Sequence, residues 1–205
     1  MKRKIHTILF LLVLCGASAV SLDVMAQDYL EPDDRFMGDN HDEYTNDLKK
    51  YLFPEEWSIG YFSVPSFSGE YGIFLLYDSI GPILIYNRFN SNYFYYWSSK
   101  NKNETAITLS RDTVRIGLEE ANHLTGIITD AIDKAVRPDG LGRLGFDGTN
   151  YYFMLPDKMA KIWSPQKNSE CEKLVKEFEK LRDLFPNEKQ YRLGLIRFLK
   201  QKLKN

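Results

Sequence analysis

Cysteine is nearly absent from this chain: Cys15 and Cys171 are the two among 205 residues. If the first 26 residues are removed, Cys171 alone remains and no disulfide can form within the chain. An excess of either charge is also missing, with 27 Lys and Arg against 28 Asp and Glu. Charge therefore gives no reason to expect a nucleic acid as partner.

Long apolar runs are lacking too, apart from one near the start. A basic beginning, an apolar run from Ile8 to Cys15 and small residues up to Ala26 are typical of a secretory signal peptide in residues 1–26. The run is too short to span a bilayer. We expect cleavage after Ala26, with a cut after Ala19 as the alternative. A lipid anchor on Cys15 is a further reading, but Leu14 precedes it where a lipobox has a small residue. The mature protein is then periplasmic or extracellular, with no transmembrane span.

Acidic residues dominate the segment that follows. Residues 27–56 carry ten Asp and Glu against three Lys and Arg and few apolar residues. This composition predicts a solvated acidic arm with a short helix near Tyr44–Leu52, ahead of one domain in residues 57–205. Asp39, His41, Asp42 and Glu43 have ligand chemistry, but neighbours in such an arm do not form a preorganised cage, so we expect no metal.

From Trp57 onward, aromatic and β-branched runs alternate with Gly, Pro, Ser and Asn. Such runs predict short strands joined by tight turns. The expected strands are Ile59–Val64, Tyr71–Tyr77, Ile83–Phe89, Tyr93–Ser98, Thr105–Leu109, Tyr151–Leu155 and Met159–Trp163.

Helical periodicity appears in three other places. Apolar residues recur every three or four positions from Leu118 to Val136, from Ser169 to Phe185, and from Glu188 to Leu203. Ser169 with Glu172 is typical of a capping box. The expected fold is α+β: a meandering antiparallel sheet of five to seven strands with two or three helices packed on it.

Three glycines, Gly140, Gly142 and Gly145, match the spacing of a dinucleotide-binding loop. In such a loop a strand precedes the glycines and a helix follows, so that free N–H groups meet the pyrophosphate. Here the expected helix comes first and a strand comes after. We interpret the glycines as a connection between them and expect no cofactor.

The stretches "EEANHLTGIITDAIDKA", "FDGTNYYF" and "KIWSP" in residues 118–184 resemble small secreted proteins of unassigned function common in Bacteroidetes. In those proteins an Asp-Gly-Thr-x-Tyr-x-Phe strand and a Trp-Ser-Pro end form a recurrent C-terminal unit. The resemblance implies an exported α+β domain and no particular chemistry.

Candidates for catalysis are few, because the mature chain keeps only His41 and His123. His123 with Cys171 would make a thiolate pair if the start of a helix lowered the pKa of the thiol; a buried structural cysteine is the competing reading. A hydrolase would need carboxylates, such as Asp147, brought together by the fold. No set of residues converges on catalysis, which favours a non-enzymatic protein.

Aromatic residues are densest between Tyr86 and Trp97. On a strand, Tyr93, Tyr95 and Trp97 would share one face, and these three are the candidate binding residues. The competing reading is that both faces are covered by packing. We predict an exported non-enzymatic binding protein that recognises another macromolecule, for example an inhibitor or immunity-type protein with a protein partner. The alternatives are a carbohydrate-binding module that uses this aromatic face, or a hydrolase.

Overall fold

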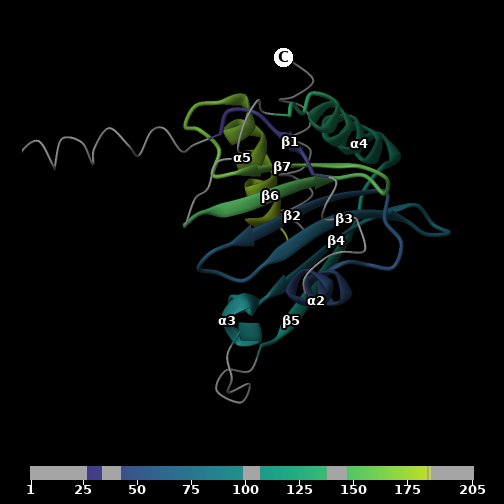
Figure 1. Cartoon of the computed structure of the whole chain (residues 1–205). Coiled ribbons are helices and arrows are strands. Elements are labelled where there is room, and N and C mark those ends of the chain that lie inside the picture. Colours follow the sequence, from purple (N-terminus) through teal and green to yellow (C-terminus); the bar gives the residue numbers. More distant parts are fainter. Residues whose placement is uncertain (1–26, 34–42, 99–106, 138–146, 184, 186–205) are drawn as a thin grey trace, which may run out of the picture.

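A seven-stranded antiparallel sheet forms the centre of the protein in the computed structural model (Figure 1). The structure describes residues 27–33, 43–98, 107–137, 147–183 and 185. The predicted signal peptide, the three glycines and the last predicted helix lie outside these residues. The elements are β1 (Glu31–Pro32), α2 (Glu43–Leu52), β2 (Ile59–Pro65), β3 (Tyr71–Tyr77), β4 (Pro82–Phe89), α3 (Tyr93–Ser98), β5 (Leu109–Arg115), α4 (Leu118–Asp133), β6 (Thr149–Met154), β7 (Met159–Trp163) and α5 (Glu170–Asp183).

The strand order is β1-β7-β6-β2-β3-β4-β5. Strands β2 to β5 form a meander, since each pairs with the next along the chain. Helix α4 then returns the chain from β5, at one edge, to β6, which pairs with the other side of β2. Strands β6 and β7 form a hairpin with Met154 opposite Met159, and the N–H of Leu155 donates to the carbonyl of Lys158 at 2.8 Å. The predicted α+β class and antiparallel meander are confirmed.

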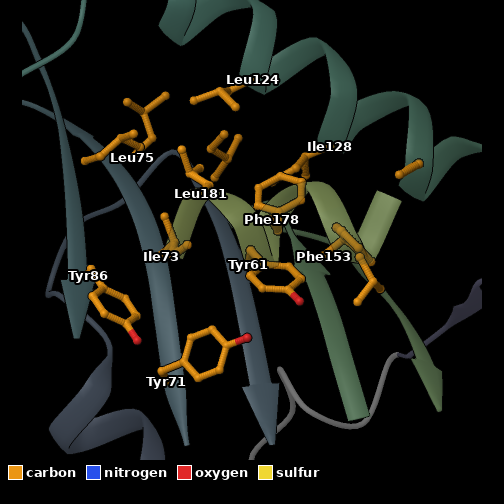
Figure 2. Close-up of a cluster of buried hydrophobic side chains, with 14 of the residues drawn as sticks. Tyr61, Tyr71, Ile73, Leu75, Tyr86, Leu124, Ile128, Phe153, Phe178 and Leu181 are labelled. Atoms are coloured by element: carbon orange, nitrogen blue, oxygen red, sulfur yellow. The ribbon is translucent and has the colours of Figure 1, made fainter. Parts of the chain in front are cut away.

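Helices cover both faces of the sheet. On one face, α4 and α5 pack Leu124, Ile128 and Phe178 against Tyr61 and Ile73 (Figure 2). On the other face, α2 and α3 pack on a second cluster that includes Phe62, Phe74 and Met154. Successive side chains of a strand point to opposite faces, so the continuous apolar runs of β2 and β3 supply both clusters. Burying one such side chain contributes about 1.5–3 kcal/mol.

Five predicted strands and three predicted helices lie where the sequence placed them. They are β2, β3, β4, β6, β7, α2, α4 and α5, with ends that differ by up to three residues within the described parts. Ser169 also caps α5 as expected, because its Oγ accepts the N–H of Glu172 at 3.0 Å. The Glu172 carboxylate accepts the N–H of Asn168 at 2.8 Å, one residue earlier than an ideal capping box requires.

Two predicted strands are wrong. Tyr93–Ser98 is a helix, α3. The strand expected at Thr105–Leu109 instead runs from Leu109 to Arg115. This segment contains arginine, aspartate and serine, so it lacks the apolar pattern from which the other strands were predicted. An edge strand accepts such polar residues because one side of it faces solvent.

The described parts of the predicted acidic arm, residues 27–33 and 43–56, pack on the sheet, although Asp28, Glu43, Glu55 and Glu56 are exposed. Strand β1 pairs with β7, and Leu48 and Leu52 of α2 are fully buried. Asp33 is buried as well, and its carboxylate lies 2.9 Å from Nζ of Lys161. The acidic composition predicted exposure to solvent, but Leu48 and Leu52 lie four residues apart and give α2 an apolar stripe that packs on the sheet. Within the described residues, none of the helices is long and apolar enough to cross a membrane.

Candidate functional site

Glu70 is a fully buried carboxylate between β2 and β3. It accepts three hydrogen bonds: from the Tyr44 hydroxyl at 2.7 Å, from the Tyr93 N–H at 2.7 Å and from the Phe94 N–H at 3.2 Å. The first N–H groups of a helix have no partner within the helix, and the helix dipole favours a negative charge there. Glu70 therefore holds the first turn of α3 against the sheet.

Asn92 explains why this aromatic segment is a helix. Its Oδ1 accepts the N–H of Tyr95 at 3.2 Å, which is the geometry of an N-cap. Its Nδ2 donates to the carbonyls of Pro65 at 2.9 Å and Ser68 at 3.1 Å in the turn between β2 and β3. Aromatic residues favour strands on average, but the cap and the Glu70 carboxylate decide the local structure. The asparagine was the sequence signal that would have revealed the helix.

The three predicted binding residues do not share a face. Tyr93 is buried at 6% exposure, stacks on Phe89 with ring centroids 4.7 Å apart, and donates its hydroxyl to Asp47 at 3.1 Å. Burial, reinforced by that carboxylate, raises the pKa of Tyr93. Trp97 is half-buried against Tyr44, at 5.6 Å between ring centroids. Tyr95 alone of the three is exposed, at 55%.

Phe94 is the residue that the strand-based reasoning missed. On a strand Phe94 would lie on the face opposite Tyr93 and Tyr95, yet it is 46% exposed and contacts Tyr95 at 6.2 Å and Trp97 at 6.1 Å between ring centroids. We call Phe94, Tyr95 and Trp97 the α3 surface. Because Glu70 and Asn92 fix the backbone of this helix, the three rings are displayed on a fixed support.

His123 and Cys171 do lie in one place, a groove of about 650 Å³ between α4, α5 and the segment before β1. Nε2 of His123 is buried and has no hydrogen-bond partner among the described residues. The Cys171 thiol donates to the carbonyl oxygen of Asp28 at 3.4 Å.

The chemistry of this groove differs from the expected thiolate pair. Burial raises the pKa of the Cys171 thiol, and the carboxylates of Asp28 and Glu170 raise it further. These effects oppose the lowering expected from the start of a helix, so they disfavour the thiolate that the expected pair requires.

A second polar cluster lies between α5 and the sheet. The hydroxyls of Tyr61 and Tyr71 both donate to Oε1 of Glu179, and Arg182 lies 2.5 Å from its Oε2. Tyr61 is fully buried, and burial followed by the Glu179 charge raises its pKa. The carboxylate is satisfied by protein groups on both oxygens, so this cluster fastens α5 to β2 and β3.

In the described part of the chain, no three His, Cys, Asp or Glu side chains form a group that would hold an ion; Asp39, His41 and Asp42 lie outside the described residues. Asp147, proposed as one carboxylate of a hydrolase, is exposed at the end of the loop before β6.

Comparison of the chain with protein-family models, curated proteins and solved structures finds no match. The resemblance to secreted Bacteroidetes proteins stays a prediction.

Proposed function

We propose that this chain is an exported, non-enzymatic binding protein that recognises another protein through the α3 surface. The observation that carries the proposal is the combination of exposure and fixation in α3. Phe94 and Tyr95 present large rings to solvent, while Glu70 and Asn92 hold the helix from within. Fixed aromatic side chains give a large contact area at low entropic cost, and they are enriched in protein interfaces.

The arrangement of the rings favours a protein over a sugar. The Phe94 and Tyr95 rings are inclined at 67°, and the Phe94 and Trp97 rings at 32°. A sugar ring stacks on the flat face of an aromatic ring, and rings inclined at 67° do not form one continuous flat face. Rings that project at different angles suit the irregular pockets of a protein surface.

The test is capture of a partner by the purified protein from an envelope extract, compared between matched variants. The double variant Phe94→Ser with Tyr95→Ser removes the exposed rings of α3. The control, Tyr77→Ser with Ile80→Ser, removes two side chains of 46% and 78% exposure, one at the end of β3 and one in the turn that leads into the start of β4. We expect the α3 variant to lose the partner and the control to keep it. Equal capture by both variants would refute the proposal.

A further inference from the structure

We infer that β5 binds an extended acidic segment of the partner as an additional antiparallel strand. This inference rests on the proposed function, because it describes the chemistry of the protein that the neighbouring α3 surface recognises. The two edges of the sheet differ in length and composition. Strand β1 has two residues and contains Pro32, so it offers little backbone for pairing. Strand β5 has seven residues and ends the sheet order on the other side.

The hydrogen bonds that flank β5 show which backbone groups point outward. The N–H of Asn90 donates to the carbonyl of Thr108, and the N–H of Ile116 donates to the carbonyl of Pro82. In an antiparallel ladder, hydrogen-bonded pairs recur at every second residue, so even-numbered residues of β5 bond to β4. The N–H and C=O groups of Leu109, Arg111, Thr113 and Arg115 therefore face the open edge, where no described strand pairs with them.

Charge along this edge defines the partner. Arg111 is exposed, and its Nε donates to the neutral amide oxygen of Asn87 at 2.8 Å. This contact orients the guanidinium without neutralising it. Arg115 differs, because its guanidinium pairs with the Asp78 carboxylate at 2.5 Å. A Glu or Asp on the added strand opposite Arg111 would form a favourable cross-strand pair.

A second copy of the chain fits this edge poorly. A two-fold axis perpendicular to the sheet places residues of the same face opposite each other. The register centred on Arg111 opposes two arginines, and the register centred on Asp112 opposes two aspartates. The register centred on Thr113 places Arg111 opposite Arg115. These three registers pair most of the strand, and like charges directly opposite are destabilising.

The same edge leads to the α3 surface. Leu109, at the start of β5, is 42% exposed and pairs with Phe89, on which Tyr93 of α3 stacks. Figure 1 shows α3 beside this end of β5. A strand added along β5 would thus continue towards Phe94 and Tyr95, so one segment of the partner would contact both features.

The probe is a capped peptide of alternating Glu and Thr, about the length of β5, titrated into the purified ¹⁵N-labelled protein. In the inferred geometry each Glu lies opposite an odd-numbered residue of β5 and turns its own N–H towards the protein. We expect the amide signals of Leu109, Arg111 and Thr113 to shift. N-methylation of the Glu residues should weaken binding about tenfold or more, whereas N-methylation of the Thr residues, which has the same number of methyl groups, should not. A peptide with Lys in place of Glu should bind more weakly.

Variants of the protein give a second measurement. Thr113→Pro removes an outward N–H without removing a bond to β4, and Thr113→Ala is its control. We expect the proline variant alone to weaken binding of the Glu-Thr peptide, with both variants as stable as the wild type. The inference would be overturned if the two methylated peptides bound equally, or if methylation of the Thr residues weakened binding instead. It would also be overturned if millimolar peptide shifted none of the amide signals, or if Thr113→Pro bound the peptide as the wild type does.

The two proposals fail separately. The double variant of Phe94 and Tyr95 leaves β5 intact and should bind the peptide as the wild type does. If capture of the natural partner requires the α3 rings but Thr113→Pro does not weaken it, the strand inference fails and the proposed function stands. If capture does not depend on the α3 rings, the proposed function fails.

Discussion

Oε2 of Glu70 lies 2.7 Å from the backbone nitrogen of Tyr93, so a side chain immediately before β3 caps a helix that begins 23 residues later. Helix α3 has six residues and is almost wholly aromatic, a length and composition that would not hold a helix alone. The carboxylate, the Asn92 cap and stacking on Phe89 supply what the segment lacks. The display of Phe94 and Tyr95 thus depends on a contact distant in sequence.

Glu70→Ala should destabilise the protein by about 3 kcal/mol, because it leaves the Tyr44 hydroxyl and two backbone N–H groups without their acceptor. Urea unfolding followed by circular dichroism measures the loss. Glu55→Ala removes an exposed carboxylate and should change the stability by no more than about 0.5 kcal/mol. Similar effects of the two substitutions would contradict the role assigned to Glu70.

Gly69→Ala and Gly126→Ala should have opposite effects. A Cβ on Gly69 would lie 2.1 Å from the carbonyl oxygen of Phe89, a backbone atom that cannot yield without moving β4, so we expect a loss of about 1–3 kcal/mol. A Cβ on Gly126, on the exposed side of α4, meets no atom within 4 Å. Alanine there should add about 0.5–1 kcal/mol, because glycine is a poor helix former. Thermal unfolding of both variants checks the signs, and a gain for Gly69→Ala would refute the close contact.

The local sequence pattern was sufficient to predict a helix or strand where one face or both faces of that element are apolar. The runs of β2 and β3 and the periodicity of α4 specify their structure without reference to distant residues. The same reasoning failed for β5, whose residues Leu109 to Thr113 lie largely in solvent. It also failed for β1, a two-residue strand that is defined by its pairing with β7, with Glu31 opposite Lys161 and Pro32 opposite Ala160.

The candidate site was predictable only as a concentration of aromatic residues. Which rings are exposed depends on whether residues 93–98 form a strand or a helix, and Glu70 and the turn carbonyls that bind Asn92 decide this through contacts distant in the sequence. Helix geometry turned Tyr93 inward and Phe94 outward, the reverse of the exposure that the proposed strand face required. The composition indicated the segment that contains the candidate site, but the fold decides which of its side chains are exposed.

Alkaline pH should weaken the fold through Tyr61. Burial raises its pKa in the folded state, whereas in the unfolded chain a tyrosine titrates near pH 10, that is, at about its ordinary value. The contribution of this pKa difference to the free energy of unfolding is complete below about pH 10. It is lost as the pH rises from there towards the pKa of the folded state, because only the unfolded state releases the proton in this range. Urea unfolding at about pH 9 and about pH 11 measures this loss.

Tyr61→Phe provides the comparison. It removes the hydrogen bond to Glu179 and should lower stability at neutral pH by about 1 kcal/mol, but it should lose less stability than the wild type between the two alkaline values. Tyr77→Phe, which changes an exposed ring, should follow the wild type. If Tyr61→Phe lost as much stability as the wild type between the two alkaline pH values, ionisation of the buried Tyr61 would not be the cause of the alkaline loss of stability.

Cys171 should react slowly with alkylating reagents in the folded protein. Burial raises its pKa, as do the carboxylates of Asp28 and Glu170, so the thiolate is less populated than in the unfolded chain at the same pH. Access also slows alkylation, but the midpoint of the rate against pH reports the pKa alone. We expect that midpoint, measured with iodoacetamide and mass spectrometry, to lie higher in the folded protein than in urea, and to fall in Asp28→Asn. Cys171→Ser supplies the background rate. A midpoint below that of the unfolded chain would restore the activated thiol that the position at the start of α5 first suggested.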